Sequence, residues 1–163
     1  MIRTFIDAWN EYKGELEEYL KITPQDQYDD YKLLVKLLFD RCINPYLNDI
    51  NETKFVTNID SIDEIDNGDY QGCSIFILHK DTYQPSVYEH VYTHNYYGSC
   101  SGCDTLQGIR DYPYDSLPNE DQIHDYMLLL LNILQQCNYF IEHDNVYSLD
   151  DEAIKYLYSK ATD

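Results

Sequence analysis

The residues best suited to chemistry are two cysteines in a Cys-x-x-Cys spacing, Cys100 and Cys103. They lie in the run Gly-Ser-Cys-Ser-Gly-Cys-Asp at residues 98–104, between a predicted strand and a predicted helix. A thiol pair at the start of a helix feels the positive end of the helix dipole, which stabilises a thiolate. The spacing therefore predicts a dithiol that cycles with a disulfide, although the chain lacks the βαβ pattern of thioredoxin-like proteins.

The same segment also has a purely structural interpretation, as a tight turn whose small cysteines are well packed. Its two glycines allow backbone angles that other residues adopt only at a cost. Ser101 with Asp104 resembles a capping box for the helix that follows. The sequence alone is compatible with both the dithiol and the structural interpretation.

A zinc site is the next alternative, because structural zinc takes four ligands and the two cysteines supply half of them. His90, His94, Cys73 and His124 are the candidates for the rest. His90 and His94 cannot both serve from a straight strand, since four residues at about 3.3 Å each place them roughly 13 Å apart. We take Cys100, Cys103 and His94 as the candidate thiol or metal site, and zinc is the one cofactor that the sequence suggests.

Anion binding is a further alternative for this loop. Gly98, Ser99, Ser101 and Gly102 offer backbone amides and hydroxyls near the start of a helix, a geometry that suits a phosphate or nucleotide. Arg110 follows closely in the sequence as a clamp for the anion. The segment lacks the Gly-Lys-Ser/Thr ending of a P-loop. A protein that sequesters a small nucleotide would fit this arrangement.

Hydrophobic periodicity predicts that these residues are positioned by one α+β domain over residues 1–163. An N-terminal helical hairpin is expected from a helix over residues 2–20 and a second helix that Thr23 caps and that ends near Asn44, before Pro45. A central antiparallel sheet of about three strands is expected within residues 53–65, 73–79 and 87–97.

The remaining predicted elements follow the Cys-x-x-Cys loop. A short helix is expected through Leu106 and Ile109, then one long helix with Ile123 to Cys137 inward. A hairpin at residues 139–147 and a C-terminal helix opened by Ser148 are expected at the end of the chain. The other three cysteines, Cys42, Cys73 and Cys137, are predicted to be core residues.

The charge of the chain restricts its partners. The formal net charge is −19 at neutral pH, from 30 acidic and 11 basic residues among 163. Phosphate binding depends on clustered Lys and Arg, so this charge argues against direct DNA or RNA binding and against anionic membranes. A basic protein is the expected partner, attracted by long-range steering. A homo-oligomer is compatible with the sequence.

One group of acids is dense enough to form a candidate binding surface: Asp60, Asp63, Glu64, Asp66 and Asp69. Their register does not match an EF-hand calcium loop, which needs acids at alternate positions, a central Gly and a Glu at the twelfth position. Further acids are spread along the chain, where they either mimic the phosphate spacing of a duplex or simply keep the protein soluble.

Signals for export, membrane insertion and catalysis are missing from the sequence. Acidic residues within the first 21 positions interrupt the apolar core that a signal peptide would need. The longest apolar run is far shorter than the roughly 20 residues of a membrane span. Five cysteines without a framework spacing suit a reducing compartment, so a cytoplasmic location is expected. No Gly-x-Ser-x-Gly, His-Glu-x-x-His or dinucleotide fingerprint occurs, which favours a non-catalytic protein.

The loop also carries a family resemblance. The run Asp-Tyr-Gln-Gly at 69–72, the strand after it and the run Tyr-Gly-Ser-Cys-Ser-Gly-Cys-Asp-Thr-Leu-Gln-Gly-Ile at 97–109 resemble a group of uncharacterised phage-encoded and bacterial proteins. The likeness covers about residues 59–137. It implies a phage or phage-derived origin and brings no activity and no catalytic residue to this chain.

Charge, the missing catalytic signatures and the resemblance together predict a non-catalytic acidic phage accessory protein. Such a protein would bind a basic host protein, for example a nucleic-acid enzyme or a defence component, in the host cytoplasm, and inhibit it. The alternatives are a thiol-redox or zinc protein that uses Cys100 and Cys103, and a nucleotide-sequestering protein that uses residues 98–104.

Overall fold

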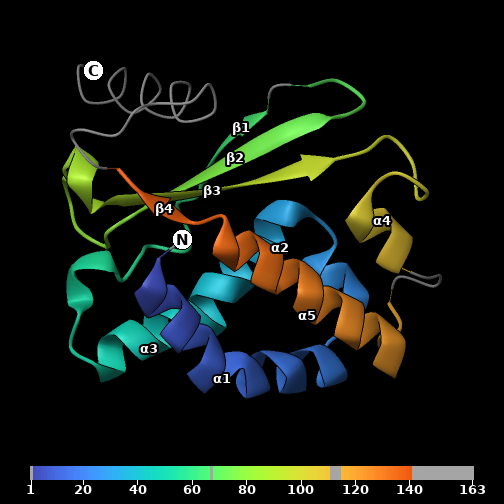
Figure 1. Ribbon diagram of the computed structural model, residues 1–163, viewed down its shortest axis with the longest axis horizontal. Helices are drawn as coiled ribbons and strands as arrows, with labels where there is room; N and C mark the ends of the chain where they lie inside the picture. The colour runs from blue at the N-terminus through green and yellow to red at the C-terminus, as the bar shows by residue number, and fades with distance from the viewer. Residues whose placement is uncertain (1, 67, 111–114, 141–163) are drawn as a thin grey trace.

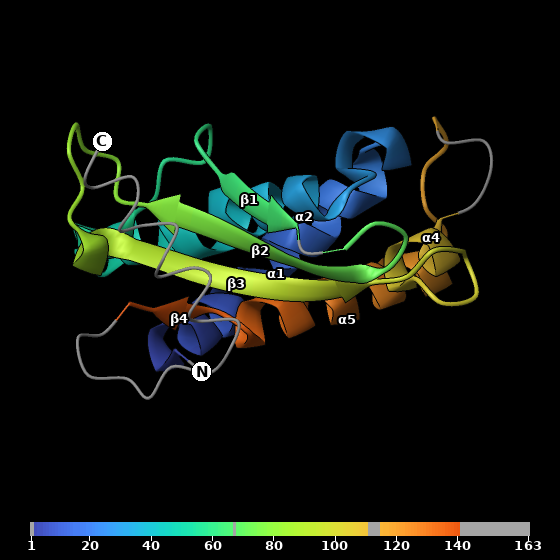
Figure 2. The ribbon, with the colours of Figure 1, turned by 90° about the horizontal axis from the view of Figure 1, so that it is seen from above.

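The computed structural model describes residues 2–66, 68–110 and 115–140. One four-stranded antiparallel sheet in the order β1-β2-β3-β4 lies over a layer of helices. Figures 1 and 2 show these helices on a single face of the sheet. The predicted α+β class is therefore confirmed.

The N-terminal helices are α1 (Arg3–Ile22), α2 (Tyr31–Leu38) and α3 (Asn44–Asp49), with a π-helical turn (Phe39–Ile43) between α2 and α3. The helical pair predicted for this part of the chain is present, but both ends of its second helix were predicted wrongly. Residues 25–28 form a separate 3₁₀ turn, and α2 starts later, where Asp30 accepts a hydrogen bond from the Leu33 amide at 2.7 Å. Asp30, and not Thr23, is its N-cap.

The predicted stop before Pro45 is also wrong, because the helical path continues through it to Asp49. A proline ring inside a regular α-helix clashes with the carbonyl four residues earlier. Here the preceding turn is π-helical, and Pro45 lies in the first turn of α3, where its missing N–H costs little.

The strands are β1 (Asp63–Asp66), β2 (Gly72–His79), β3 (His90–Tyr97) and β4 (Asn138–Tyr139). The run 53–65 is a strand only at its end, because Thr53–Phe55 is a 3₁₀ turn. Likewise Val87–Glu89 is a 3₁₀ turn, which the Ser86 and Glu89 capping box holds. Adjacent strands pair in antiparallel register, with Ile75 opposite His94.

The last described helices, α4 (Thr105–Ile109) and α5 (Glu120–Gln135), agree with the prediction. Asn119 and Gln122 form a capping box at the start of α5. The sheet gains a fourth strand from β4, directly after α5. The predicted hairpin lies mostly, and the Ser148 helix wholly, outside the described residues.

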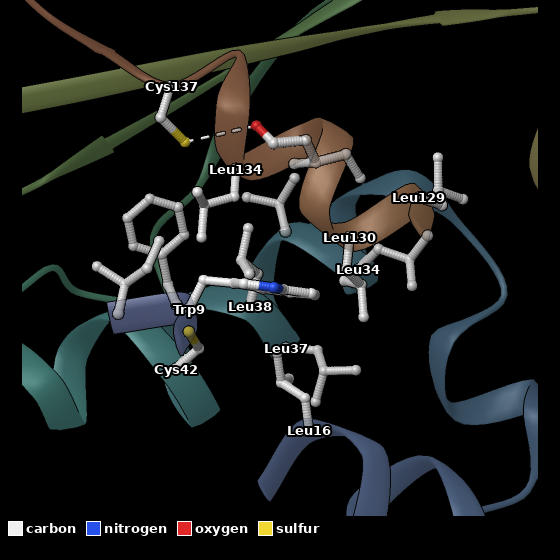
Figure 3. Close-up of a cluster of buried hydrophobic side chains, with 14 of the residues drawn as sticks. Trp9, Leu16, Leu34, Leu37, Leu38, Cys42, Leu129, Leu130, Leu134 and Cys137 are labelled. Atoms are coloured by element: carbon white, nitrogen blue, oxygen red, sulfur yellow. Dashed lines mark hydrogen bonds between the residues drawn. The ribbon is translucent and has the colours of Figure 1, made fainter. Parts of the chain in front are cut away.

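The main core fills the space between the sheet and the helices. Figure 3 shows Trp9 of α1 among leucines of the other helices, including Leu38 and Leu130. The three cysteines predicted as core residues, Cys42, Cys73 and Cys137, are buried. Thr93 ties β3 to α5 by donating a hydrogen bond of 2.7 Å to the Ile133 carbonyl.

The opposite face of the sheet carries a second apolar cluster, formed by Ile75, Ile77, Tyr92 and Phe140. Side chains alternate along a strand, so Ile75 and Ile77 point away from the main core that Phe76 and Leu78 join. Within the described ranges, no helix has the length and apolar character that a bilayer span requires.

Candidate functional site

The Cys-x-x-Cys loop, residues 98–104, connects β3 to α4, and the buried Asp104 carboxylate holds it in shape. One carboxylate oxygen accepts hydrogen bonds from the Gly98 amide and from the Tyr31 hydroxyl, each at 3.0 Å. The other oxygen accepts from the Gln107 amide at 2.9 Å and so caps α4. One side chain thereby joins the end of β3, α2 and α4.

The predicted capping role of Ser101 is therefore wrong, because Asp104 is the N-cap of α4. Tyr31 takes part as well, since its hydroxyl accepts a hydrogen bond from the Leu106 amide at 3.2 Å. Burial raises the pKa of Tyr31 to about 12, which keeps this hydroxyl a donor to Asp104. Sequence reasoning missed Tyr31, which lies more than 70 residues away along the chain.

The glycines of this loop are needed for space and not for unusual backbone angles, which corrects the sequence-based expectation. No described glycine has a positive φ. A Cβ atom at Gly98 would meet the Cys103 carbonyl and lie 2.9 Å from the Asp104 amide nitrogen, and one at Gly108 would lie 2.9 Å from the Ser101 carbonyl oxygen. At Gly102 the nearest atom is 4.0 Å away. The chain therefore closes tightly at Gly98 and Gly108 but not at Gly102.

This closure brings the two exposed cysteines together. Their Sγ atoms lie 2.8 Å apart, and both are free thiols. The Cys103 sulfur accepts a hydrogen bond from the Cys100 amide at 3.0 Å, and the Ser99 hydroxyl lies 3.7 Å from it. Hydrogen bonds with the Cys100 side chain and, to a smaller extent, with the Ser99 side chain lower the pKa of the Cys103 thiol below its usual value of 9.0.

His94, the third candidate ligand, lies elsewhere. It is on β3, where its ring packs edge-on against the Tyr96 ring with centroids 5.7 Å apart. It lines a pocket beside α4 and α5, whose walls include neither Cys100 nor Cys103. Among the described residues, no group of three or more His, Cys, Asp or Glu side chains is arranged to hold a metal ion.

The Cys-x-x-Cys loop forms one wall of a cleft with a volume of about 840 Å³. We call it the acidic cleft, because five of its lining residues are acidic and two are basic. The acidic residues are Asp29, Asp30, Glu64, Asp66 and Asp104, and the basic ones are Lys32 and Arg110. The five acids come from the segment before α2, from β1 and from the Cys-x-x-Cys loop, so only folding brings them together.

The structure divides the five predicted surface acids. Glu64 and Asp66 line the acidic cleft, whereas Asp63 alternates with Glu64 along β1 and faces the other side of the sheet. Asp60 forms an ion pair with Lys36 of α2 at 3.2 Å. Asp69 is exposed in the connection to β2.

Hydrogen bonds stabilise the negative charge of Asp66, one of the residues that line the cleft. The Tyr97 hydroxyl and the Gly68 amide donate to Asp66, and they lower the pKa of its carboxyl group. The same bond to Asp66 raises the pKa of Tyr97 to about 12. Asp66 therefore stays ionised, and Tyr97 stays neutral, at physiological pH.

Comparison with known proteins gives no family. No protein-family model, no curated protein and no solved structure matches this chain. The chemistry of the site must therefore be argued from its own geometry.

The predicted anion-binding residues all lie at or near the acidic cleft, but several of their donors are already engaged. The Gly98 amide donates to Asp104, and the Cys100 amide donates to the Cys103 sulfur. Arg110 donates from Nη1 to the Asp29 carbonyl at 2.7 Å. With five carboxylates around it, the cleft favours a cationic group over a phosphate.

Two of the cleft carboxylates, Asp29 and Asp30, were not predicted as site residues. The sequence-based prediction placed both acids inside the second helix, whereas in the structure they precede α2, and nothing in the sequence indicated that they would face β1. The four ion pairs found in the described part of the chain involve other acids. Of the cleft carboxylates, Asp30, Glu64 and Asp66 are exposed to solvent, whereas Asp104 is buried and hydrogen-bonded within the loop.

Proposed function

We propose that this protein is a non-catalytic acidic accessory protein of the phage type, which acts by stoichiometric binding to a basic host protein. The observation that carries the proposal is the acidic cleft, in which carboxylates from separate segments surround one concave surface. A volume of about 840 Å³ is within the range of binding clefts in proteins. The cleft can therefore accept one or more basic side chains.

The electrostatics of the whole chain support the same partner. A net charge of −19 attracts basic surfaces over long distances, and the cleft then provides a local site where the attraction is directional. Steering of this kind raises association rates and weakens with salt, because the Debye length falls from about 10 Å at 0.1 M to about 3 Å at 1 M. Binding is expected to be salt-sensitive.

The class of target follows from what an acidic surface displaces. A host enzyme that binds nucleic acid presents Lys and Arg to phosphates, and ordered carboxylates compete for the same side chains. The resemblance to phage-encoded proteins supports such a target, or a component of anti-phage defence, in the host cytoplasm. Inhibition would result from occupation of the basic surface, without any covalent step.

The experiment is a pull-down from host lysate with the tagged full-length chain, eluted along a salt gradient and read by mass spectrometry. A cleft variant, Glu64→Lys with Asp66→Lys, is compared with a control of equal charge change on α1, Glu11→Lys with Glu15→Lys. Both acids of the control are exposed, and neither lines the acidic cleft.

The proposal expects one dominant basic protein that the parent and the control retain and that the cleft variant loses. Affinity for the purified protein should fall at least roughly tenfold in the cleft variant at low salt, as for close charge pairs at interfaces. Equal loss in both variants would mean that net charge, and not the cleft, binds the partner. A melting-temperature increase with a nucleotide panel, without any captured protein, would favour nucleotide sequestration instead.

A further inference from the structure

The two exposed cysteines form a site that the binding function does not use. Of the five cysteines, Cys42, Cys73 and Cys137 are buried, whereas Cys100 and Cys103 are exposed, and Cys100 lines the acidic cleft. Their sulfur atoms are 2.8 Å apart, and a disulfide bond is about 2.05 Å long. The two sulfurs are therefore already close to bonding distance.

The surroundings distinguish the two sulfurs. Cys103 Sγ accepts from the Cys100 amide and has the Ser99 hydroxyl and the Cys100 thiol beside it, so three groups can stabilise a thiolate there. The lowered pKa of Cys103 agrees with this geometry. Of the two sulfurs, Cys103 is therefore the better placed to attack and Cys100 to resolve.

The loop that carries the pair has a defined shape. Asp104 bonds the start of the loop at Gly98 and the first turn of α4 that follows the loop, and the close approach at Gly98 leaves no room for a side chain. A pair held at one distance by the fold does not depend on chance encounters of two mobile thiols. Proximity of this kind favours an intramolecular reaction over one with a second molecule.

We propose that Cys100 and Cys103 form a thiol–disulfide exchange site whose preferred co-substrates are cationic disulfides. The Cys103 thiolate attacks one sulfur of the disulfide, which forms a mixed disulfide and releases one thiolate. Cys100 then loses its proton and attacks the Cys103 sulfur, which breaks the mixed disulfide and releases the second thiolate. The dithiol is oxidised by two electrons, the co-substrate is reduced to two thiols, and the two cysteine protons neutralise the leaving thiolates.

The preference for a cationic co-substrate follows from the walls of the cleft. Five acidic residues and two basic ones line the cleft together with Cys100. The Cys103 sulfur is not part of this lining, but it lies 2.8 Å from the Cys100 sulfur and so experiences the same local charge. An anionic disulfide such as oxidised glutathione is repelled, and a dication such as cystamine is attracted. The difference should decrease with salt, because the acids at the mouth of the cleft are exposed.

The test uses the fully reduced, full-length chain in the presence of a chelator, with cystamine and oxidised glutathione as probes. Intact-mass spectrometry follows the loss of two hydrogens, and peptide mapping locates the new bond. Cys100→Ser and Cys103→Ser are compared with Thr105→Ala, a control at an exposed residue that follows the loop and does not line the acidic cleft. Circular dichroism verifies that each variant is folded.

The parent and the Thr105→Ala control should form the Cys100–Cys103 disulfide, with cystamine reacting at least roughly tenfold faster than oxidised glutathione at low salt. Cys100→Ser should accumulate a stable mixed disulfide on Cys103, and Cys103→Ser should react more slowly at Cys100. A new bond at any other cysteine would overturn the proposal, and so would equal rates with the two probes or a faster reaction at Cys100 than at Cys103. Because the test needs no protein partner, its outcome is independent of the proposed binding function.

Discussion

Replacing Asp104 by alanine tests the central claim about how the site is built. The carboxylate accepts three hydrogen bonds, from the Gly98 amide, the Tyr31 hydroxyl and the Gln107 amide. Each is worth about 1 kcal/mol net, and the one from Gln107 is also the N-cap of α4. Their loss should lower the free energy of unfolding by about 3 kcal/mol.

The assay is urea unfolding followed by circular dichroism, together with a thermal melt. At about 2–4 °C per kcal/mol for a chain of this size, the melting temperature should fall by about 6–12 °C. Asp104→Asn keeps one carbonyl oxygen but turns an amide group toward a donor, so an intermediate loss is expected. Thr105→Ala, at the exposed next residue, is the control and should stay within about 0.5 kcal/mol of the parent.

If Asp104→Ala were as stable as Thr105→Ala, the Asp104 carboxylate would not stabilise the fold as its three hydrogen bonds predict. That result would mean that water replaces the carboxylate without cost and that the loop does not depend on it. The conformation of the thiol pair would then depend on the backbone turn in which the Cys103 and Asp104 amides donate to the Cys100 carbonyl, at 3.0 and 2.8 Å.

Three further predictions follow from other parts of the structure. Gly98→Ala should destabilise the fold by about 1–3 kcal/mol in urea unfolding, whereas Gly102→Ala should be nearly neutral, because only the first Cβ meets backbone atoms. Equal effects would show that the loop adapts freely. Burial lowers the pKa of His90 below its usual 6.5, so the unfolded state binds this proton first. Stability should therefore fall from about pH 7 to about pH 5 by more in the parent than in His90→Gln, and parallel pH curves would contradict this. Thr93→Val should cost about 1–2 kcal/mol through its lost bond to Ile133, and a neutral result would mean that this bond does not stabilise the packing of β3 on α5.

Local sequence determined much of the fold. The three- and four-residue spacing of apolar side chains was enough to place α1 and α5, and the apolar run in β2 was enough to place the centre of the sheet. These patterns work because a helix or a strand must bury one face, whatever the rest of the chain does. The small residues around the two cysteines likewise indicated a connection between a strand and a helix, which is found between β3 and α4.

The element boundaries needed the structure, since they depend on which donors and acceptors meet. Asp30 caps α2 in place of Thr23, and a π-helical turn lets the chain pass Pro45. Asp104 takes the cap of α4 from Ser101 because its carboxylate also serves Gly98 and Tyr31. Propensities alone cannot rank such competing bonds.

The site itself was decided by the tertiary structure. The sequence by itself determined the net charge, the Cys-x-x-Cys loop and the acids of β1. Only folding brought Asp29 and Asp30 opposite Glu64 and Asp66, and only folding moved His94 away from the two thiols. The physical reason is that a cleft is built from long-range contacts, whose distances depend on how β1, α2 and the Cys-x-x-Cys loop pack together, and no local pattern encodes them.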